Sequence, residues 1–399
     1  MADSLSAPPI QAPLIVHVIH QFDMGGLENG LVNLLNHLPP QRYRHAIVCL
    51  SNASDFARRL AAPGVEVISL GKREGKDPCH YLRLYRTLRR LRPDIVHTRN
   101  LACIEAQLFA ALAGVRLRVH GEHGRDITDL HGTSRKYRWL RKLMRPLVRH
   151  FIAVSDDLAR WLVDAIGAAP ARVSYIGNGV DSARFYPRQR AAARLAVGPP
   201  GFICPGACVI GSVGRMVQVK DFPTLVQSFL MLLKQYAGKV PLRLVLVGDG
   251  PARQQCHTML QSAGVAHLAW LPGARDDVPQ LMRAMDVFVL PSLAEGSSNT
   301  ILEAMASGLP VVATRVGGNA ELVQAGWNGA LVPPRAPALL AAALSDYVRA
   351  PELGMLHGER GRRQVLARHS LQAMAGAYLA LYDQMAVQPG RQQPEATPG

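Results

Sequence analysis

Cysteine is scarce in this sequence, and its six residues are scattered along the chain. None forms a C-x-x-C pair, and the Cys204–Cys208 spacing, which comes nearest to that of a metal-ligand pair, has no second pair or histidine cluster to accompany it. Structural zinc sites usually combine two such pairs. We therefore expect no metal, and the scattered cysteines favour a reducing, cytoplasmic compartment.

Targeting signals and long apolar runs are absent as well. The first thirteen residues lack both the basic segment and the apolar stretch of a secretory signal. No run approaches the roughly 18 apolar residues that a membrane-spanning helix needs. We accordingly expect a protein that acts in the cytoplasm without a membrane-spanning helix.

Two nucleotide-binding fingerprints are missing. No G-x-x-x-x-G-K-[ST] segment occurs, and neither the loop at Gly25-Gly26 nor Gly248-Asp249-Gly250 fits G-x-G-x-x-G. These absences disfavour Walker-type nucleotide hydrolases and nicotinamide enzymes that carry the fingerprint.

Acidic residues are few relative to basic ones, with 29 Asp and Glu against 45 Lys and Arg and a formal charge of +16. The excess is uneven, because residues 1–190 carry 28 basic and 16 acidic side chains and the remainder 17 and 13. Such a surplus indicates an anionic partner: nucleic acid, a phosphorylated small molecule or an acidic membrane. Aromatic residues make up only 6% and no nucleic-acid-binding module is recognisable, which weakens the first of these.

Short apolar runs alternate with helix-length segments along the whole chain. The runs lie at 14–20, 45–50, 65–70, 94–100, 115–121, 150–155 and 172–177, and then at 208–214, 242–248, 267–273, 287–292, 310–314 and 329–333. This alternation predicts parallel sheets with helices on both faces. Since 399 residues exceed one ordinary core and the pattern breaks near residue 187, we predict two doubly wound α/β domains that face one another across an interdomain cleft.

The predicted domain boundaries follow from these runs. We expect a flexible N-terminus (1–13), a first domain (14–190), a linker (191–206), a second domain (207–369), a terminal helix (370–386) that packs back on the first domain, and a disordered tail (387–399). Ligands of open parallel sheets bind beyond the carboxyl ends of the strands, so the loops after the strands are where chemistry is expected.

Two such loops lie in the first domain. Gly25 and Gly26 could let the backbone approach an anion at a helix start, or could form an ordinary tight turn. In Gly121-Glu122-His123-Gly124, His123 is the better candidate for a site histidine because glycines flank it. A structural histidine and a metal site are the alternatives for this segment, although its H-x-x-H spacing lacks the helical geometry of H-E-x-x-H.

The second domain offers cations and a small-residue loop. Arg215 and Lys220 follow a buried strand next to Gly214 and could hold a diphosphate, or could be solvated surface charges. Glu295 begins a loop that could offer N–H groups to a phosphate before a helix, through Gly296, Ser297, Ser298, Asn299 and Thr300. Glu303 could accept hydroxyl hydrogen bonds, although Thr300 and Glu303 also have the spacing of a capping box.

Taken in order, these segments resemble those of the retaining glycosyltransferases of family four, which have the GT-B fold of two facing Rossmann-like domains. The resemblance covers roughly residues 14–386. It rests on the Glu295…Glu303 pair with seven residues between, on Gly25-Gly26, GEHG, Ser155 in AVSDDL, Asn178-Gly179-Val180-Asp181, Gly214-Arg215 with Lys220-Asp221, and Gly248-Asp249-Gly250. The GGLENG and GEHGRD segments resemble in particular the transferases of exosortase/PEP-CTERM exopolysaccharide systems.

The resemblance implies a function and a set of roles. It implies transfer of a sugar with retention from a UDP- or GDP-sugar, without a metal cofactor, to a lipid-linked oligosaccharide. Arg215 and Lys220 would neutralise the diphosphate, Glu295 would hold the donor sugar, Glu303 the ribose, and His123 would lie at the reacting sugar. The donor-binding set comprises Gly25, Gly26, Gly214, Gly248, Asp249, Gly250, Gly296, Ser297, Ser298, Asn299, Thr300 and Glu303. A GT-B sugar-nucleotide epimerase is the alternative reaction. Many relatives have Gly-Phe-Gly-Leu where this loop reads Gly-Ser-Ser-Asn-Thr, so the donor sugar is not assigned.

Two basic segments could bind an anionic membrane. Residues 135–149 hold seven cations and no acid, with Leu140, Leu143, Met144, Leu147 and Val148 at helical spacing, while 83–92 form a second basic stretch. The membrane interpretation uses Arg138, Arg141, Lys142 and Arg145 and places the protein on the inner face of the cytoplasmic membrane. Solvated outer faces of helices are the alternative, and Pro146 would kink or end such a helix.

Overall fold

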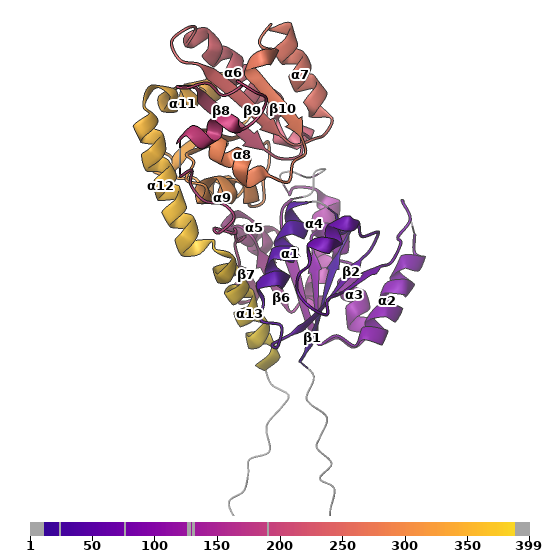
Figure 1. The fold of residues 1–399 in the computed structure, drawn as a ribbon. Coiled ribbons are helices and arrows are strands. Elements are labelled where there is room, and N and C mark those ends of the chain that lie inside the picture. The colour runs from indigo at the N-terminus through magenta and orange to yellow at the C-terminus, as the bar shows by residue number, and fades with distance from the viewer. Residues whose placement is uncertain are drawn as a thin grey trace, which may run out of the picture.

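A computed structural model of the chain describes residues 12–23, 25–75, 77–125, 129, 132–189 and 191–387. Most of the predicted flexible N-terminus and of the predicted tail lies outside these described residues, as does Asp126 of the GEHGRD segment. Two α/β domains follow one another along the chain (Figure 1).

A seven-stranded parallel sheet forms the first domain, with the strand order β3-β2-β1-β4-β5-β6-β7. Its strands are β1 (Leu14–Ile19), β2 (Arg44–Cys49), β3 (Glu66–Ser69), β4 (Ile95–Arg99), β5 (Leu117–Glu122), β6 (His150–Ala153) and β7 (Val173–Tyr175). Strand β1 reads LIVHVI and is buried along its whole length, as expected of a strand covered on both faces. The strand order reverses between β1 and β4, so a ligand site is expected beyond the carboxyl ends of these strands.

Helices cover both faces of this sheet. They are α1 (Gly26–His37), α2 (Cys79–Leu91), α3 (Ala106–Leu112), α4 (Arg135–Met144) and α5 (Asp156–Trp161), with the terminal α13 (Leu371–Val387). Apolar side chains of α1 and α13 share one core cluster, and those of α2 and α3 share another on the opposite face. Helix α4 ends two residues before Pro146, which lies in a short 3-10 turn.

The second domain repeats the same plan with six parallel strands in the order β10-β9-β8-β11-β12-β13. They are β8 (Cys208–Val213), β9 (Leu242–Val247), β10 (Ala269–Gly273), β11 (Val287–Leu290), β12 (Val311–Thr314) and β13 (Gly329–Val332). The helices are α6 (Phe222–Gln235), α7 (Ala252–Ser262), α8 (Val278–Ala284), α9 (Asn299–Ala306), α10 (Asn319–Leu322), α11 (Pro337–Arg349) and α12 (Pro351–Arg368). Helices α6, α7 and α11 contribute to the core on one face, and α8, α9 and α12 to the core on the other. The predicted fold class, two doubly wound parallel sheets, is confirmed.

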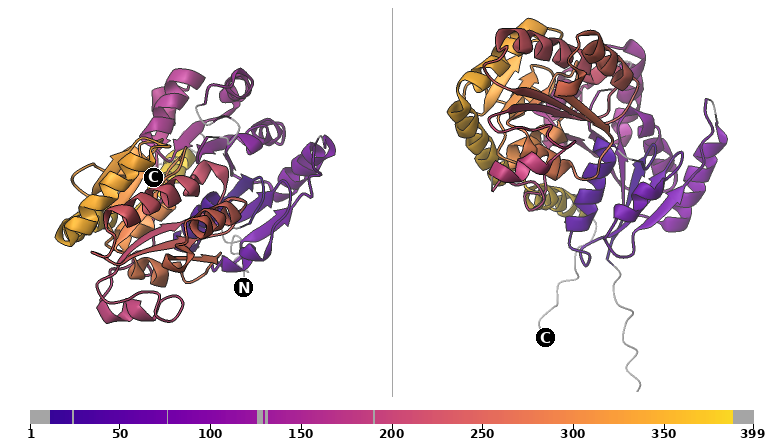
Figure 2. Two further views of the ribbon diagram at one scale, coloured as in Figure 1. Left: turned by 90° about the horizontal axis from the view of Figure 1, so that it is seen from above. Right: turned by 45° about the horizontal axis from the view of Figure 1, so that its top comes forward.

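The chain passes between the domains twice, after β7 and between α12 and α13 (Figures 1 and 2). The two passages lie side by side, because the Val180 N–H donates to the His369 carbonyl at 2.8 Å and Val180 pairs with Ser370 in an isolated bridge. Beyond this point α13 packs Tyr378 and Tyr382 into the core of the first domain.

Residues of the predicted linker pack against the second domain. Phe202 and Ile203 are buried in the core of the second domain, and Arg194 forms an ion pair with Asp286 at 2.6 Å.

In the part of the chain that the structure describes, no helix combines the length and apolar character needed to cross a bilayer.

Candidate active site

The carboxyl ends of the two sheets meet, and the loops that follow their strands touch. The Asn299 side-chain amide, at the start of α9, donates to the Gly26 carbonyl at the start of α1 (3.1 Å). The loop after β5 packs against the loop after β11 so closely that a Cβ on Gly296 would lie 2.6 Å from the His123 carbonyl oxygen and 2.7 Å from the Gly124 Cα. The structure therefore brings the predicted site loops of both domains together.

A second contact across the junction involves a residue that the sequence did not single out. The carboxylate of Glu321 in α10 accepts the backbone N–H groups of Asp156 and Asp157 at the start of α5, at 2.8 and 2.9 Å. Free N–H groups and the positive end of a helix favour a carboxylate. Glu321 thus connects the second domain to α5 of the first.

Lys220 and Glu295, which the resemblance assigns to different parts of the donor, form an ion pair. The Lys220 Nζ lies 2.5 Å from the Glu295 Oε1, and the Ser292 hydroxyl donates to the same oxygen at 2.6 Å. The Arg215 side chain, in contrast, is exposed and makes no hydrogen bond or ion pair with any residue that the structure describes. A free guanidinium next to a paired lysine gives this loop one cation that is immediately available to an anion and one that must exchange its partner.

Two glycines of the second domain allow the loop after β9 to pack closely against the loop after β8. Gly248 (φ 136°) and Gly250 (φ 144°) adopt backbone angles that other residues rarely reach. A Cβ on Gly250 would lie 2.6 Å from the Met216 carbonyl oxygen, and one on Gly248 would collide with the Gly214 carbonyl. A cavity of about 440 Å³ borders Asp249 and Gly250 between α7 and β10.

At the start of α1, a carboxylate occupies the place expected for a donor phosphate. A Cβ on Gly25 would collide with the carboxylate of Glu28, which therefore lies over this glycine. Burial raises the pKa of Glu28, whereas the charges of Arg215 and Arg99 act in the opposite direction. A phosphate that approached Gly25 would have to displace this side chain.

The start of α9 excludes the capping-box explanation for Glu303. The helix is capped by Ser298, whose hydroxyl accepts the Ile301 N–H at 3.3 Å, so Thr300 is already inside the helix. The Glu303 carboxyl has no hydrogen-bond partner among the residues that the structure describes. Burial raises the pKa of its carboxyl to about 7, against the charges of Arg184 and Arg59. The carboxyl is left available to a ligand.

His123 is held by its backbone, and its ring nitrogen is left without a partner. Its N–H donates to the side-chain oxygen of Asn100 at 2.7 Å, and Asn100 has a positive φ of 57°. The buried Nε2 of His123 has no hydrogen bond to a described residue. Burial and the charge of Arg99 lower the pKa of His123 to about 3, so the ring is neutral near pH 7 and can only donate or accept a hydrogen bond.

The metal alternative for the GEHG segment does not fit the structure. Because side chains alternate along a strand, His120 and Glu122 point away from the face on which His123 lies. His120 instead lies 3.3 Å from Glu122, whose carboxylate is paired with Arg141. Among the described residues no group of three or more His, Cys, Asp and Glu side chains could hold a metal ion.

The membrane assignment of Arg141 is wrong. Its side chain is 4% exposed, it forms an ion pair with Glu122, and it stacks over the Trp161 ring with 4.9 Å to the ring centre. Arg138 and Arg145 are partly buried and donate to backbone carbonyls after α5, so Lys142 is the exposed member of the predicted four. Leu143, one of the apolar residues predicted to share a helical face, is exposed together with Trp139.

Sequence comparisons identify the same two halves of the chain. Residues 24–184 match a family model described as Glycosyltransferase Family 4, and residues 207–349 match one described as Glycosyl transferases group 1. The chain is 33% identical over 239 residues to D-inositol 3-phosphate glycosyltransferase 2 of Catenulispora acidiphila, covering 58% of this chain and 55% of that protein. It is 29% identical over 332 residues to the UDP-Gal:alpha-D-GlcNAc-diphosphoundecaprenol alpha-1,3-galactosyltransferase of Escherichia coli, covering 80% and 83%.

Solved structures show the same fold. HepE of Anabaena, in complex with UDP-glucose, superposes with a TM-score of 0.77 at 20% identity, covering 93% of this chain and 99% of that one. Sucrose-phosphate synthase of Thermosynechococcus elongatus gives a TM-score of 0.78 at 19% identity, covering 94% and 100%. The predicted GT-B arrangement of two Rossmann-like domains is confirmed.

Proposed function

Because the chain belongs to the group 1, family 4 glycosyltransferases, we propose that it transfers a sugar with retention from a nucleotide-diphosphate sugar to a lipid-linked glycan acceptor. The observation that carries this proposal is the meeting of the Glu295 loop and Lys220 with the His123 loop at one junction. HepE, which shares the fold, binds UDP-glucose, and the relative from Escherichia coli is named for an undecaprenol-linked acceptor. Both favour a UDP-sugar donor and a polyprenol-linked acceptor.

The residues divide the work of the reaction. Arg215 and Lys220 stabilise the charge that develops on the departing diphosphate as the anomeric carbon–oxygen bond breaks. Glu303 accepts hydrogen bonds from the ribose hydroxyls. The acceptor oxygen attacks from the face of the leaving group and gives its proton to the departing phosphate, which preserves the anomeric configuration. His123, being neutral, offers a hydrogen bond to the reacting sugar rather than a charge.

Donor binding requires a change of partners at Glu295. In the unliganded chain its carboxylate is committed to Lys220 and Ser292. A diphosphate that takes over Lys220 leaves the Glu295 Oε1 with Ser292 alone, so this oxygen can then accept a hydroxyl of the donor sugar. Binding of the donor would thus make both Lys220 and Glu295 available to it in one exchange of partners.

The outer surface of the first domain supports a membrane location and a lipid-linked acceptor. Helix α4 exposes Trp139 (64%) and Leu143 (50%) beside Lys142, while α2 exposes Leu82 and several arginines. Apolar side chains among cations suit an anionic membrane, so we place the protein on the inner face of the cytoplasmic membrane, where a lipid-linked acceptor is presented. The pathway would be exopolysaccharide or cell-envelope polysaccharide synthesis. The GGLENG and GEHGRD segments support an exosortase/PEP-CTERM system as the particular pathway.

Nucleotide binding tests the donor half of the proposal. A thermal-shift panel of UDP, GDP and ADP, followed by their sugars, should single out one nucleotide, since a ligand at 100 times its Kd adds about 2.7 kcal/mol of stability. Arg215→Ala and Lys220→Ala should abolish that shift and the transfer, whereas Lys234→Ala, an exposed cation of α6 in the same domain, should change neither. Transfer at the wild-type rate in both site variants would refute the diphosphate role. Free sugar or an epimerised sugar nucleotide, formed without acceptor, would favour the epimerase instead.

Vesicle sedimentation tests the membrane half. Binding to anionic vesicles should fall when Trp139 and Lys142 are replaced by alanine and glutamine, and should be unchanged in Lys234→Gln. Equal sedimentation of all three proteins would reject α4 as the docking surface.

A further inference from the structure

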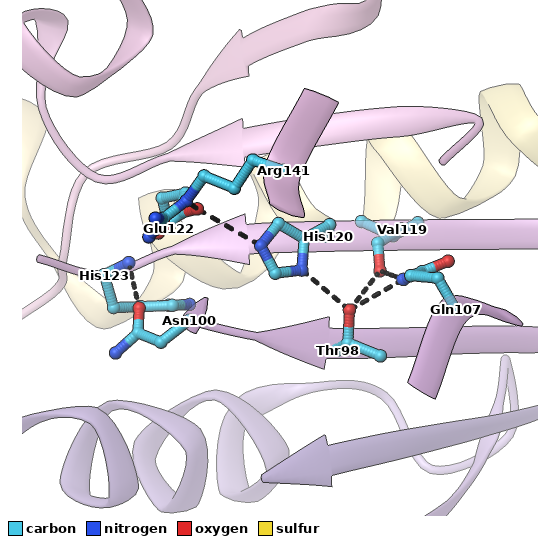
Figure 3. Close-up of polar contacts among 8 residues, drawn as sticks. All are labelled: Thr98, Asn100, Gln107, Val119, His120, Glu122, His123 and Arg141. Carbon is cyan, nitrogen blue, oxygen red and sulfur yellow. Dashed lines mark hydrogen bonds and ion pairs between the residues drawn. The ribbon is translucent and has the colours of Figure 1, made fainter. Parts of the chain in front are cut away.

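A buried polar network lies directly behind His123 and takes no part in the roles assigned above (Figure 3). It runs from Gln107 of α3 through Thr98 of β4 and His120 of β5 to Glu122, and ends at Arg141 of α4. The first four side chains are 0% exposed and Arg141 is 4% exposed. Buried polar groups are costly unless they are paired, so a five-membered network needs a reason.

The donors and acceptors of the network fix its direction. Both N–H groups of Gln107 are used, because Nε2 donates to the Thr98 hydroxyl (2.6 Å) and to the Val119 carbonyl (2.8 Å). Because the ionised carboxylate of Glu122 can only accept, the His120 nitrogen that faces it carries the proton, which leaves Nδ1 to accept the Thr98 hydroxyl at 2.8 Å, a shorter distance than the 3.4 Å to the Val119 carbonyl. His120 therefore carries its proton on Nε2 and donates it to Glu122.

Apart from the Gln107 N–H that the Val119 carbonyl accepts, the donors of this chain consequently lead from Gln107 through Thr98 and His120 to the carboxylate of Glu122. Arg141 approaches this carboxylate from the other side with two donors, Nε to Oε1 at 2.5 Å and Nη2 to Oε2 at 3.1 Å. Burial alone would raise the pKa of Glu122, yet Arg141 and His120 hold it at about 2. The carboxylate is thus ionised and held by donors on both of its oxygens.

Glu122 is the last residue of β5, and the chain continues directly into His123. The carboxylate of Glu122 is fixed from the α4 side of the sheet, while the next N–H is fixed by Asn100 on β4's loop. His123 and Gly124 then make the backbone contact with Gly296 of the other domain. The direction in which β5 ends decides where His123 lies.

We propose that Arg141 is a positioning residue, whose ion pair with Glu122 fixes the end of β5 and thereby sets His123 and Gly124 against the Glu295 loop. This inference rests on the proposed function, because His123 is taken as a residue of the transfer site. A buried ion pair is weak support for stability, since apolar side chains of similar size often serve as well. The bidentate geometry of the Arg141–Glu122 pair, however, fixes the orientation of the carboxylate, which an apolar contact does not.

The test compares single and paired replacements. Arg141→Met and Glu122→Gln should each lower kcat by about 100-fold, as expected when reacting groups are displaced by about 1 Å, while KM for the donor changes less than twofold. Lys234→Met removes an exposed cation of α6, which has no assigned part in the transfer site or in membrane docking, and should leave kcat unchanged. The double variant Glu122→Gln/Arg141→Met leaves no unpaired charge, so its Tm should recover while its kcat should not.

Two results would overturn the inference. One is a double variant whose kcat recovers together with its Tm, since that would show a purely structural role. The other is unchanged hydrogen exchange at the His123 amide in Arg141→Met, because this readout of the β5 end does not depend on turnover. Failure of the wild-type protein to bind any sugar nucleotide would count against the proposed function alone, whereas exchange at His123 would still judge the ion pair.

Discussion

Replacing Glu303 with glutamine should stabilise the unliganded protein and weaken its donor site. The pKa of Glu303 is raised from an ordinary 4.5 to about 7, chiefly by burial. Each pKa unit corresponds to about 1.4 kcal/mol between the two protonation states, so the ionised carboxylate costs the folded protein about 3 kcal/mol.

The sign of the effect follows from which state holds the proton. Between pH 4.5 and 7 the folded protein keeps a proton on Glu303 that the unfolded chain has lost, so stability falls as the pH rises. The cost is absent below pH 4.5 and complete above pH 7. Glu303→Gln removes it, and the variant should therefore gain nothing at pH 4 and about 3 kcal/mol at pH 8.

Urea unfolding at pH 4, 6 and 8 measures this difference. Glu74→Gln, which removes an exposed carboxylate without a partner among the described residues, is the control and should show no pH-dependent gain. Glu303→Gln should also bind UDP or GDP more weakly than the wild type at pH 8, because the amide replaces a charged acceptor for the ribose hydroxyls. A parallel pH dependence of wild type and Glu303→Gln would refute the argument that burial controls this carboxyl.

Three further predictions follow from the junction. Gly296→Ala should fold but lose transfer, because a Cβ would lie 2.6 Å from the His123 carbonyl oxygen; circular dichroism and kcat measure the two outcomes, and wild-type kcat would contradict the close contact. Glu321→Gln should loosen the link to α5 and increase the radius of gyration in small-angle X-ray scattering, whereas an unchanged radius would show that other contacts suffice. In the wild-type protein kcat/KM should rise with pH through about 7 as Glu303 ionises, and this rise should be absent in Glu303→Gln. His123, with a pKa of about 3, stays neutral over this range and does not contribute to the rise. A rise that persists in Glu303→Gln would show that another group causes it.

The strands could be predicted because parallel strands are buried on both faces. Each of the thirteen apolar runs corresponds to a strand of the structure, with ends that differ by at most a few residues. The loops of the site could be predicted for the same reason, since they follow those strands. Their pairings could not, because Lys220 and Glu295 lie 75 positions apart and nothing local in either segment signals the other.

One wrong assignment and one alternative that the sequence left open have identifiable physical causes. Arg141 looks like its neighbours in a run of seven cations, and only the position of Glu122 on an adjacent strand selects it for burial. Ser298 and Thr300 are both acceptable helix caps, so the spacing of Thr300 and Glu303 could not decide where α9 begins. In both cases the choice depends on contacts between elements that are distant in the sequence.

The position of α13 has a consequence for how this chain is made. The first domain places Tyr378 and Tyr382 of α13 in its core, so that core is incomplete until α13 has been synthesised. The second domain ends with α12 and is in effect an insertion, with its two ends joined at Val180 and His369. During synthesis the N-terminal domain of a protein usually completes its folding first. Here the first domain must wait for α13, which is made after the second domain. The inserted domain can finish folding before the domain that hosts it.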